Sequence, residues 1–395
     1  MQISHYAQAL ATSQTVAITS KAKQLKKEGQ DMIILAAGEQ DFNTPDNVKE
    51  AAISAIREGF TKYTDATGII ELKQAVADTF RRNNGLDYQT DQIVVTNGGK
   101  HAIFAALMAT INPGDEVLIP APYWVTYPEV VKLVGAKAVI LPAADAAGFK
   151  LTPAQLEAAI TDKTRMLILN SPSNPTGSVY TREELTGLAA VVKGRDLYVL
   201  TDEIYEKIIY DEQEHVSIAT LEGIKDQCLV VNGASKAFSM TGWRMGWVAV
   251  PPSLGPVMKR IQSQTTHHPC SITQKATLAA LTSPQGFMDG WVAEFDERRK
   301  YVVNRLNGIE PITCLIPKGA FYVFPSMAEC CGKRAGKTVI RNSEDFCNYL
   351  LEHLVAVVPG SAFGAENYFR ISYAASMDDL TKALDRIEKA VGDLS

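Results

Sequence analysis

The sequence is poor in cysteine, has no long apolar run and carries no surplus of positive charge, and each of these shortages excludes a class of protein. Its six cysteines are scattered over 395 residues, and no two form a CxxC pair. This arrangement suits neither a disulfide framework nor a zinc motif, so we expect reduced thiols, no metal site and a cytoplasmic location. No apolar run approaches the roughly 20 residues that a membrane helix needs.

The balance of charge excludes two kinds of partner. Lysine and arginine total 39 against 44 aspartates and glutamates, which gives a formal net charge of -5. Proteins that bind nucleic acid or anionic membranes use clustered basic residues, and this chain has no basic tract, so we expect neither partner. A small anionic ligand stays compatible with the composition, because a few buried cations can hold one. The N-terminus, MQISHYAQAL, lacks the basic segment and apolar core of a signal peptide.

The middle of the chain alternates short apolar runs with amphipathic stretches, a pattern typical of a doubly wound α/β sheet. Several runs are apolar at consecutive positions, as strands buried on both faces are. Ligands of such a sheet bind beyond the carboxyl ends of its strands, so we expect the chemistry there. The predicted strands cover residues 92–97, 116–120, 137–142, 165–170, 197–202, 228–233 and 245–250.

The C-terminal part has a different pattern, with a long helix over residues 296–306, short strands and a last helix from Met377. This order is typical of a small α+β domain. The N-terminal segment is expected to pack on that domain or on a second subunit. We therefore expect a large domain over residues 46–290, and a small domain made by residues 1–45 and 291–395.

Lys236 follows one of these predicted strands, and its flanking residues suit a phosphate ester. Burial at a strand end lowers the pKa of a lysine and makes it a nucleophile toward a carbonyl group. Ser235 precedes it and Arg244 follows among glycines. A hydroxyl and a guanidinium can therefore converge on a phosphate. The alternative is an ordinary surface lysine in a loop.

Polar residues also end two neighbouring predicted strands. Asp202 closes an apolar strand, where a carboxylate can bind a metal, cap a helix or pair with a cationic ring nitrogen. Tyr205 can donate a hydrogen bond to a phenolate oxygen, or can pack in the core. Asn174 lies in the turn NPTG, which its prolines make rigid. Asn174 has a function only if its amide faces the same cleft.

Three further features fit an anionic, flat ligand. Gly98, Gly99 and Lys100 stand between a predicted strand and a predicted helix, where backbone N–H groups and the helix dipole form an anion site. This segment matches neither GxxxxGK[ST] nor GxGxxG. Trp124 can stack on a ring or fill the core. Arg370 lies among apolar residues and needs an anion, which is either a substrate carboxylate or an Asp or Glu side chain.

Four segments in this order, NPTG, DEIY, SKAFSMTGWRMG and FRISYA, make the chain resemble the class I aminotransferases of the fold-type I pyridoxal-5′-phosphate (PLP) enzymes. Within them it is most similar to the bacterial-type (I-beta) aspartate aminotransferases. The resemblance runs nearly end to end. It implies a seven-stranded, mostly parallel sheet in the large domain, and transfer of an amino group from an L-amino acid, aspartate first, to 2-oxoglutarate through PLP and pyridoxamine phosphate.

The resemblance also implies a role for each motif residue. Lys236, Asp202 and Tyr205 would be catalytic, with Lys236 binding the cofactor and Asp202 pairing with its pyridine nitrogen. The implied cofactor site consists of Gly98, Gly99, Lys100, Trp124, Asn174, Asp202, Tyr205, Ser235, Lys236 and Arg244, with Tyr63 from a neighbouring subunit of a homodimer. The implied substrate site consists of Gly38, Lys100, Trp124, Asn174 and Arg370.

Three details of this sequence carry expectations about specificity. Lys100 is expected to recognise the side-chain carboxylate of an acidic substrate. Gln40 stands where most relatives have proline, and we expect it to loosen a loop beside the substrate. Relatives that also accept prephenate carry an N-terminal arginine, whereas this chain has Tyr6 near that position, so we expect little prephenate activity.

Other functions stay open at this point. A broad-range or aromatic aminotransferase shares most of these residues, and so does a PLP-dependent β-lyase on the same fold. A PLP-sensing transcription regulator would need a basic DNA-binding module, which the sequence does not contain. The sequence leaves the roles of His267 and His268 undecided.

Overall fold

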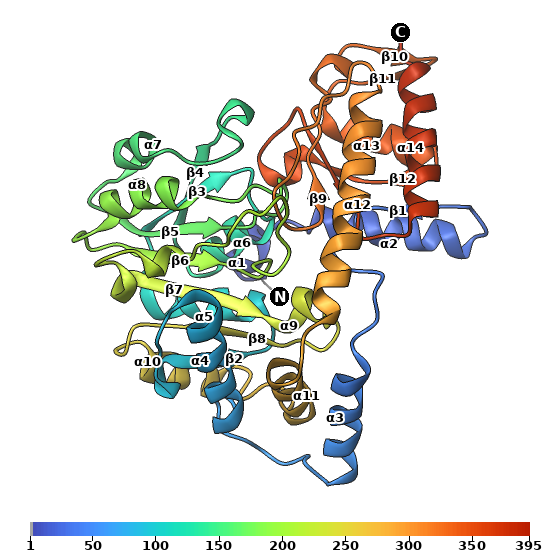
Figure 1. Cartoon of the computed structure of the whole chain (residues 1–395). Coiled ribbons are helices and arrows are strands. Elements are labelled where there is room, and N and C mark those ends of the chain that lie inside the picture. Colours follow the sequence, from blue (N-terminus) through green and yellow to red (C-terminus); the bar gives the residue numbers. More distant parts are fainter. Residues whose placement is uncertain (1–2) are drawn as a thin grey trace.

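A seven-stranded sheet crosses the larger part of the molecule in the order β2-β8-β7-β6-β5-β3-β4. The computed structural model describes residues 3–395 (Figure 1). Strand β8 runs antiparallel to its neighbours β2 and β7, and the remaining pairs are parallel. The predicted seven-stranded, mostly parallel sheet is therefore confirmed. The strands are β2 (Ile93–Thr96), β3 (Glu116–Ala121), β4 (Lys137–Pro142), β5 (Thr164–Asn170), β6 (Tyr198–Asp202), β7 (Cys228–Gly233) and β8 (Gly246–Ala249).

Helices cover both faces of this sheet, which explains the apolar runs in its strands. In β5, Leu167 and Leu169 belong to one hydrophobic core, whereas Met166 and Ile168 belong to another. Successive strand residues point to opposite faces, so a strand between two cores needs apolar residues throughout. The helices on the first face are α4 (Ile70–Asn84), α8 (Arg182–Val192) and α11 (Ser271–Thr282). Those on the second are α5 (Gly99–Thr110), α6 (Thr126–Leu133) and α10 (Gly255–Gln264).

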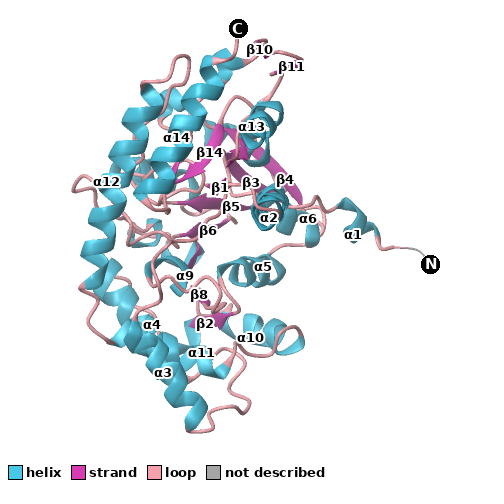
Figure 2. Cartoon of the chain, turned by 90° about the vertical axis from the view of Figure 1, so that its right-hand side faces the viewer, coloured by secondary structure: helices cyan, strands magenta, loops and turns pink. Residues whose placement is uncertain are grey.

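A second, smaller part of the molecule is built on the long helix α12 (Phe287–Asn307), which runs from the sheet to the C-terminal part in both views (Figure 2). Its three-stranded antiparallel sheet has the order β13-β14-β9 and shares one core with α12, α13 and α14. The elements are β9 (Tyr322–Val323), α13 (Ser343–Glu352), β12 (Val355–Ala356), β13 (Val358–Pro359), β14 (Phe369–Ser372) and α14 (Met377–Gly392). Shorter or peripheral elements are α3 (Asp46–Arg57), α7 (Pro153–Ala159), α9 (Ala234–Ala237), β10 (Arg334–Ala335) and β11 (Thr338–Val339).

The N-terminal segment contacts both parts of the molecule. Strand β1 (Ile33–Ile34) pairs in parallel with β12, and α2 (Gln14–Lys27) packs beside them, as expected. Helix α1 (His5–Ala9) instead lies beside α6, and the N–H of Ala11 donates to Glu129 at 2.9 Å. Helix α1 therefore does not pack on the C-terminal part of its own chain, and its packing on a second subunit stays a prediction. No helix within residues 3–395 combines the length and the apolarity that crossing a membrane requires.

Candidate active site

A cavity of about 620 Å³ opens beyond the carboxyl ends of β5, β6 and β7, where the large sheet meets the part of the molecule built on α12. It lies where ligands of doubly wound sheets bind. Most residues singled out in the sequence line it, from elements far apart in the chain. These residues are Gly38, Gly99, Lys100, Trp124, Asn174, Asp202, Tyr205, Ser235, Lys236, Arg244 and Arg370.

Asp202 ends β6 and is nearly buried, at 5% exposure. The hydroxyl of Tyr127 donates to its Oδ2 at 2.8 Å, and the N–H of Ile204 donates to its Oδ1 at 3.3 Å. Burial raises the pKa of Asp202 to about 6, and the hydrogen bond from Tyr127 opposes that rise. A cationic partner in the cavity would stabilise the carboxylate further.

Lys236 lies in α9, the short helix that begins where β7 ends. Its Nζ donates to the carbonyl oxygen of Gly38 and lies 5.7 Å from the ring centres of Tyr205 and Phe321. Burial lowers the pKa of Lys236 to about 8, and the positive charge of Arg370 acts in the same direction. About a tenth of this amine is then neutral at pH 7, and the neutral form is the nucleophile toward a carbonyl group.

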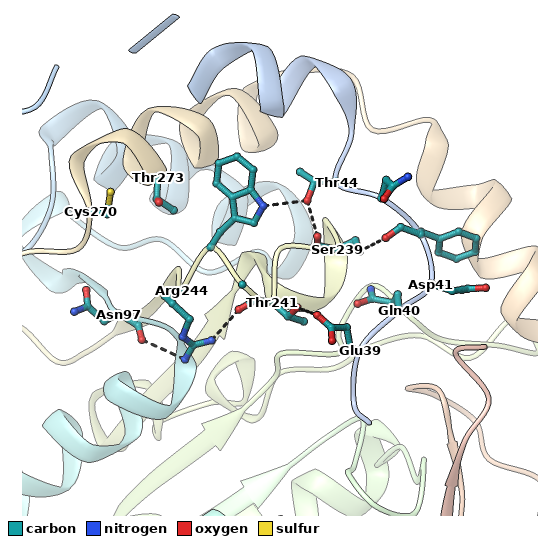
Figure 3. Close-up of a pocket in the computed structure, with 14 residues that line it drawn as sticks. Glu39, Gln40, Asp41, Thr44, Asn97, Ser239, Thr241, Arg244, Cys270 and Thr273 are labelled. Atoms are coloured by element: carbon teal, nitrogen blue, oxygen red, sulfur yellow. Dashed lines mark hydrogen bonds between the residues drawn. The ribbon is translucent and has the colours of Figure 1, made fainter. Parts of the chain in front are cut away.

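A positively charged end of the cavity lies at the N-terminus of α5. Gly98 has a φ of 89°, and a Cβ there would lie 2.5 Å from Nη2 of Arg244, so only glycine lets the guanidinium come so close to the backbone. Arg244 donates to the carbonyl oxygens of Thr241 and Asn97 at 3.0 and 3.4 Å (Figure 3). Burial and the nearby Arg244 lower the pKa of Lys100. These cations have no acidic partner among the described residues, so they favour an anionic ligand.

Arg370, in the middle of β14, is 2% exposed. Its guanidinium donates to Oδ1 of Asn174 at 2.8 Å and to the carbonyl oxygen of Ala36 at 2.6 Å, while Nε has no partner within residues 3–395. Within the same residues it forms no ion pair with Asp or Glu. In the part of the chain that the structure describes, the structural salt bridge left open at the sequence level therefore does not occur, and this buried cation has no counter-ion.

Asn174 meets the condition set for it, because its side chain faces the same cavity. Its own N–H donates to Oδ1 of Asn170 at 2.8 Å, and the amide of Asn170 donates to the carbonyl oxygen of Asp202 at 2.8 Å. Asn170 therefore joins the ends of two neighbouring strands, and this fixes Asn174 relative to Asp202.

Tyr63 lies apart from the cavity of its own chain and is 85% exposed. Its ring stacks on His267 at a centroid distance of 5.1 Å and an interplanar angle of 6°, and it meets the edge of His268 at 5.7 Å. The two histidines therefore support Tyr63, which gives them a structural relationship that the sequence did not reveal.

The segment around Gln40 differs from the expectation. Gln40 is buried, and its side-chain amide donates to the main-chain carbonyl of Lys236. Thr44 donates to the carbonyl oxygen of Ser239 at 2.6 Å, and Ser239 donates to that of Phe42 at 2.5 Å, so this segment is tied to the loop after Lys236 (Figure 3). The expectation that Gln40 loosens the loop is wrong, because the amide provides a hydrogen bond that proline cannot.

Sequence reasoning missed several residues of this cavity that can contribute to its chemistry. Tyr127 follows Trp124 by three positions, which places both on one side of the turn that begins α6. Tyr322 lies in the apolar segment GAFYVFP and therefore reads as a core residue. Asn170 ends a predicted strand and was visible in principle. Lys23, on α2, brings a cation to the cavity wall from the N-terminal segment.

The set of side chains fits PLP. The cations near the N-terminus of α5 suit its phosphate, the amine of Lys236 suits its aldehyde, and Asp202 suits its pyridinium nitrogen. Gly98 leaves space where any side chain would displace Arg244.

The chain belongs to the family of class I and II aminotransferases, whose match covers residues 30–387. It is therefore an aminotransferase, and the enzymes of this family depend on PLP.

Individual relatives agree over the full length. The chain is 49% identical to the aspartate/prephenate aminotransferase of Cereibacter sphaeroides, over 97% of each chain. It is 45% identical to the crystal structure of the aspartate aminotransferase from Rhizobium meliloti, with a TM-score of 0.97 over 100% of both chains. It is 40% identical to the aspartate aminotransferase from Thermus thermophilus with maleate, with a TM-score of 0.93 over 99% of this chain and 100% of that one.

Proposed function

We propose that this aminotransferase takes the amino group of L-aspartate and gives it to 2-oxoglutarate by ping-pong chemistry on PLP bound to Lys236. One observation carries the proposal: among the described residues, Arg370 in β14 and Lys100 with Arg244 near the N-terminus of α5 are cations without acidic partners. They lie at separate places around one cavity, which Lys236 also lines. A dicarboxylate needs two cationic contacts. The maleate named with the Thermus thermophilus relative is a dicarboxylate, which supports this choice.

Each residue then has a defined task. Arg370 holds the substrate α-carboxylate with its free N–H groups, assisted by Asn174 and Gly38. Lys236 would hold the cofactor through its amine and, as the general base, would take the proton from the substrate α-carbon. Asp202 keeps the pyridine nitrogen of the cofactor protonated, and bound PLP supplies the electron sink for that proton removal. Tyr205 donates to the phenolic oxygen of the cofactor.

The proposal also covers the phosphate site, the homodimer and the two domains. The phosphate is held by Gly98, Gly99, Lys100, Ser235 and Arg244, and Trp124 packs against the ring. Two copies form a homodimer in which the exposed Tyr63 reaches the partner's phosphate site. Residues 46–290 form one domain, and residues 1–45 with 291–395 form the other, which carries Arg370 and closes over the substrate.

Closure has a direct structural test. Crystal structures with and without a bound substrate analogue should show the second domain in different positions. Identical positions in the two states would count against closure while leaving the proposed reaction intact.

Single-turnover spectroscopy tests the proposed reaction. The purified PLP form is mixed separately with aspartate, alanine, tyrosine and kynurenine, and the band of the bound cofactor is followed. We expect this band to give way to that of pyridoxamine phosphate, fastest with aspartate. No cofactor band after reconstitution with PLP would contradict the assignment of Lys236.

The same spectroscopy and two further activity assays separate the alternative activities. A fastest conversion with tyrosine would indicate an aromatic enzyme, the activity that names a Pyrococcus horikoshii structure 39% identical to this chain. Release of ammonia and pyruvate from a cysteine-type substrate would indicate a β-lyase. The names of several relatives include prephenate. From the missing N-terminal arginine we still expect little turnover of prephenate, and efficient turnover would overturn that expectation.

A further inference from the structure

Tyr322 lines the cavity between Tyr205 and Arg370. It stands on β9, next to the strand of Arg370, and pairs with Ser372 of β14. Its side chain is completely buried. Its hydroxyl oxygen is 2.7 Å from that of Tyr205, and either group can be the donor in the protein alone.

Two further contacts fix the ring of Tyr322. The guanidinium carbon of Arg370 lies 4.5 Å from its ring centre, within the range of a cation–π contact. A Cβ on Gly38 would lie 2.5 Å from the Tyr322 hydroxyl, so the absence of a side chain at Gly38 gives that hydroxyl its position. The carbonyl oxygen of Gly38 in turn accepts from Lys236. Tyr322 therefore contacts Tyr205 and Arg370 directly. It also packs against Gly38, whose carbonyl oxygen accepts the hydrogen bond from Lys236.

The number of available protons decides the direction of the hydrogen bond in the loaded enzyme. Each tyrosine has one O–H donor. When Tyr205 donates its only proton to the phenolic oxygen of the cofactor, the bond at 2.7 Å must be donated by Tyr322 to Tyr205. Donation to an oxygen strengthens the bond that the same oxygen's own proton makes, so Tyr322 makes Tyr205 a better donor.

We propose that Tyr322 is a positioning residue of the aminotransferase reaction, with its hydroxyl holding and polarising Tyr205 and its ring supporting Arg370. This inference rests on the proposed function, because it needs the cofactor beside Tyr205. The two halves of the side chain thus serve different partners, and substitutions can separate them.

The hydroxyl is tested by the Tyr322→Phe variant, which keeps the ring. The phenolic oxygen of the cofactor is more negative when the nitrogen that joins it to Lys236 has lost its proton. A donor to that oxygen therefore lowers the pKa of this linkage. Weakening Tyr205 should raise the pKa, read from the absorbance of the bound cofactor between pH 5 and 10, by about 0.5 unit in Tyr322→Phe. Tyr205→Phe should raise it more, and the double variant should equal Tyr205→Phe alone.

The ring is tested by Tyr322→Leu, which removes both contacts. Relative to Tyr322→Phe, we expect the KM for the amino donor to rise roughly 3- to 30-fold, because Arg370 loses its aromatic support. The matched control is Tyr373→Phe. Tyr373 is another completely buried tyrosine outside the cavity, and its hydroxyl oxygen lies 3.0 Å from the carbonyl oxygen of Ala320 and 3.2 Å from the hydroxyl oxygen of Tyr210.

The possible outcomes distinguish a failure of this inference from a failure of the proposed function on which it rests. If the wild-type protein shows no cofactor band, the proposed function fails and the role of Tyr322 fails with it. If the wild type shows the band, but Tyr322→Phe leaves its pKa unchanged, only the role of the Tyr322 hydroxyl is overturned. An equal shift in Tyr373→Phe, or additive shifts in Tyr205→Phe and Tyr322→Phe, would also overturn it.

Discussion

The hydroxyl of Tyr127 donates a hydrogen bond of 2.8 Å to the carboxylate of Asp202 at the base of the cavity. Both side chains are buried, and the bond is the strongest local support for a charge at this position. Burial of that charge nevertheless dominates, and the pKa of Asp202 stands at about 6 instead of 3.8. The protein therefore keeps an unfavourable carboxylate that a cationic ligand would compensate.

This cost should be visible in the stability of the apoprotein. Between pH 4 and 6 the native state binds more protons at Asp202 than the unfolded state, so its contribution to stability falls as the pH rises and stays constant above pH 6. Asp202→Asn removes the contribution. We expect the variant apoprotein to be more stable above pH 6 by up to about 3 kcal/mol, and the difference to vanish below pH 4.

Urea unfolding of both apoproteins at equal concentration, from pH 4 to 8, measures this difference. Tyr127→Phe is the opposing control, because it removes the donor and should lower the stability at pH 7 by about 1 kcal/mol. Equal stability of wild type and Asp202→Asn at pH 8 would show that burial of the charged carboxylate does not destabilise the apoprotein.

Attachment of the cofactor should depend on pH through Lys236. Its pKa of about 8 means that the nucleophilic neutral amine becomes the main form above pH 8. We expect the rate at which the apoprotein binds PLP covalently to rise from pH 6.5 and to level off above pH 9, with a midpoint near 8. Stopped-flow absorbance measures this rate. A midpoint near 10 would mean that burial does not lower the pKa of this lysine.

Lys100 should determine the preference for an acidic substrate. Lys100→Ala removes an ammonium near Arg244, and we expect the KM for aspartate to rise at least tenfold while that for alanine changes less than threefold. Steady-state kinetics at saturating PLP separate this effect from weaker cofactor binding. Lys100→Arg keeps the charge and serves as the control. Equal increases for both amino acids would remove the assignment.

Gln40 should contribute to stability rather than to mobility. Gln40→Ala leaves the carbonyl of Lys236 without its donor in a buried place, and we expect a loss of about 1–3 kcal/mol in the free energy of unfolding. Gln24→Ala is the matched control, because its amide donates to Glu28 on the exposed surface and should cost less than 0.5 kcal/mol. If both variants lose the same small amount, the buried bond has no special value.

The sheet could be predicted because its strands lie between two cores. Met166 to Leu169 are apolar at every position, and such a run has few interpretations when turns flank it. Residues such as Asp202 and Lys236 were found because they interrupt or follow these runs. The position of a strand end is local information, and the fold then brings the strand ends together.

Residues whose function depends on a distant partner could not be predicted. Tyr322 is an aromatic residue in an apolar segment, and only the register of β9 against β14 places its hydroxyl beside Tyr205. Gln40 suggested a loose loop because its partner, the carbonyl of Lys236, is unrelated to it in the sequence. The part that Tyr63 plays in a partner's site stays a prediction.

The parallel pairing of β1 with β12 affects the order in which parts of the protein can fold during synthesis. Ile33 leaves the ribosome long before its partner Val355 is synthesised. The carbonyl of Ala36 must likewise wait for Arg370. Contacts so distant along the chain form late and slowly, while the central sheet can assemble earlier. A nascent chain can thus possess the lysine and the aspartate of the cavity before it possesses the arginine that would hold a substrate.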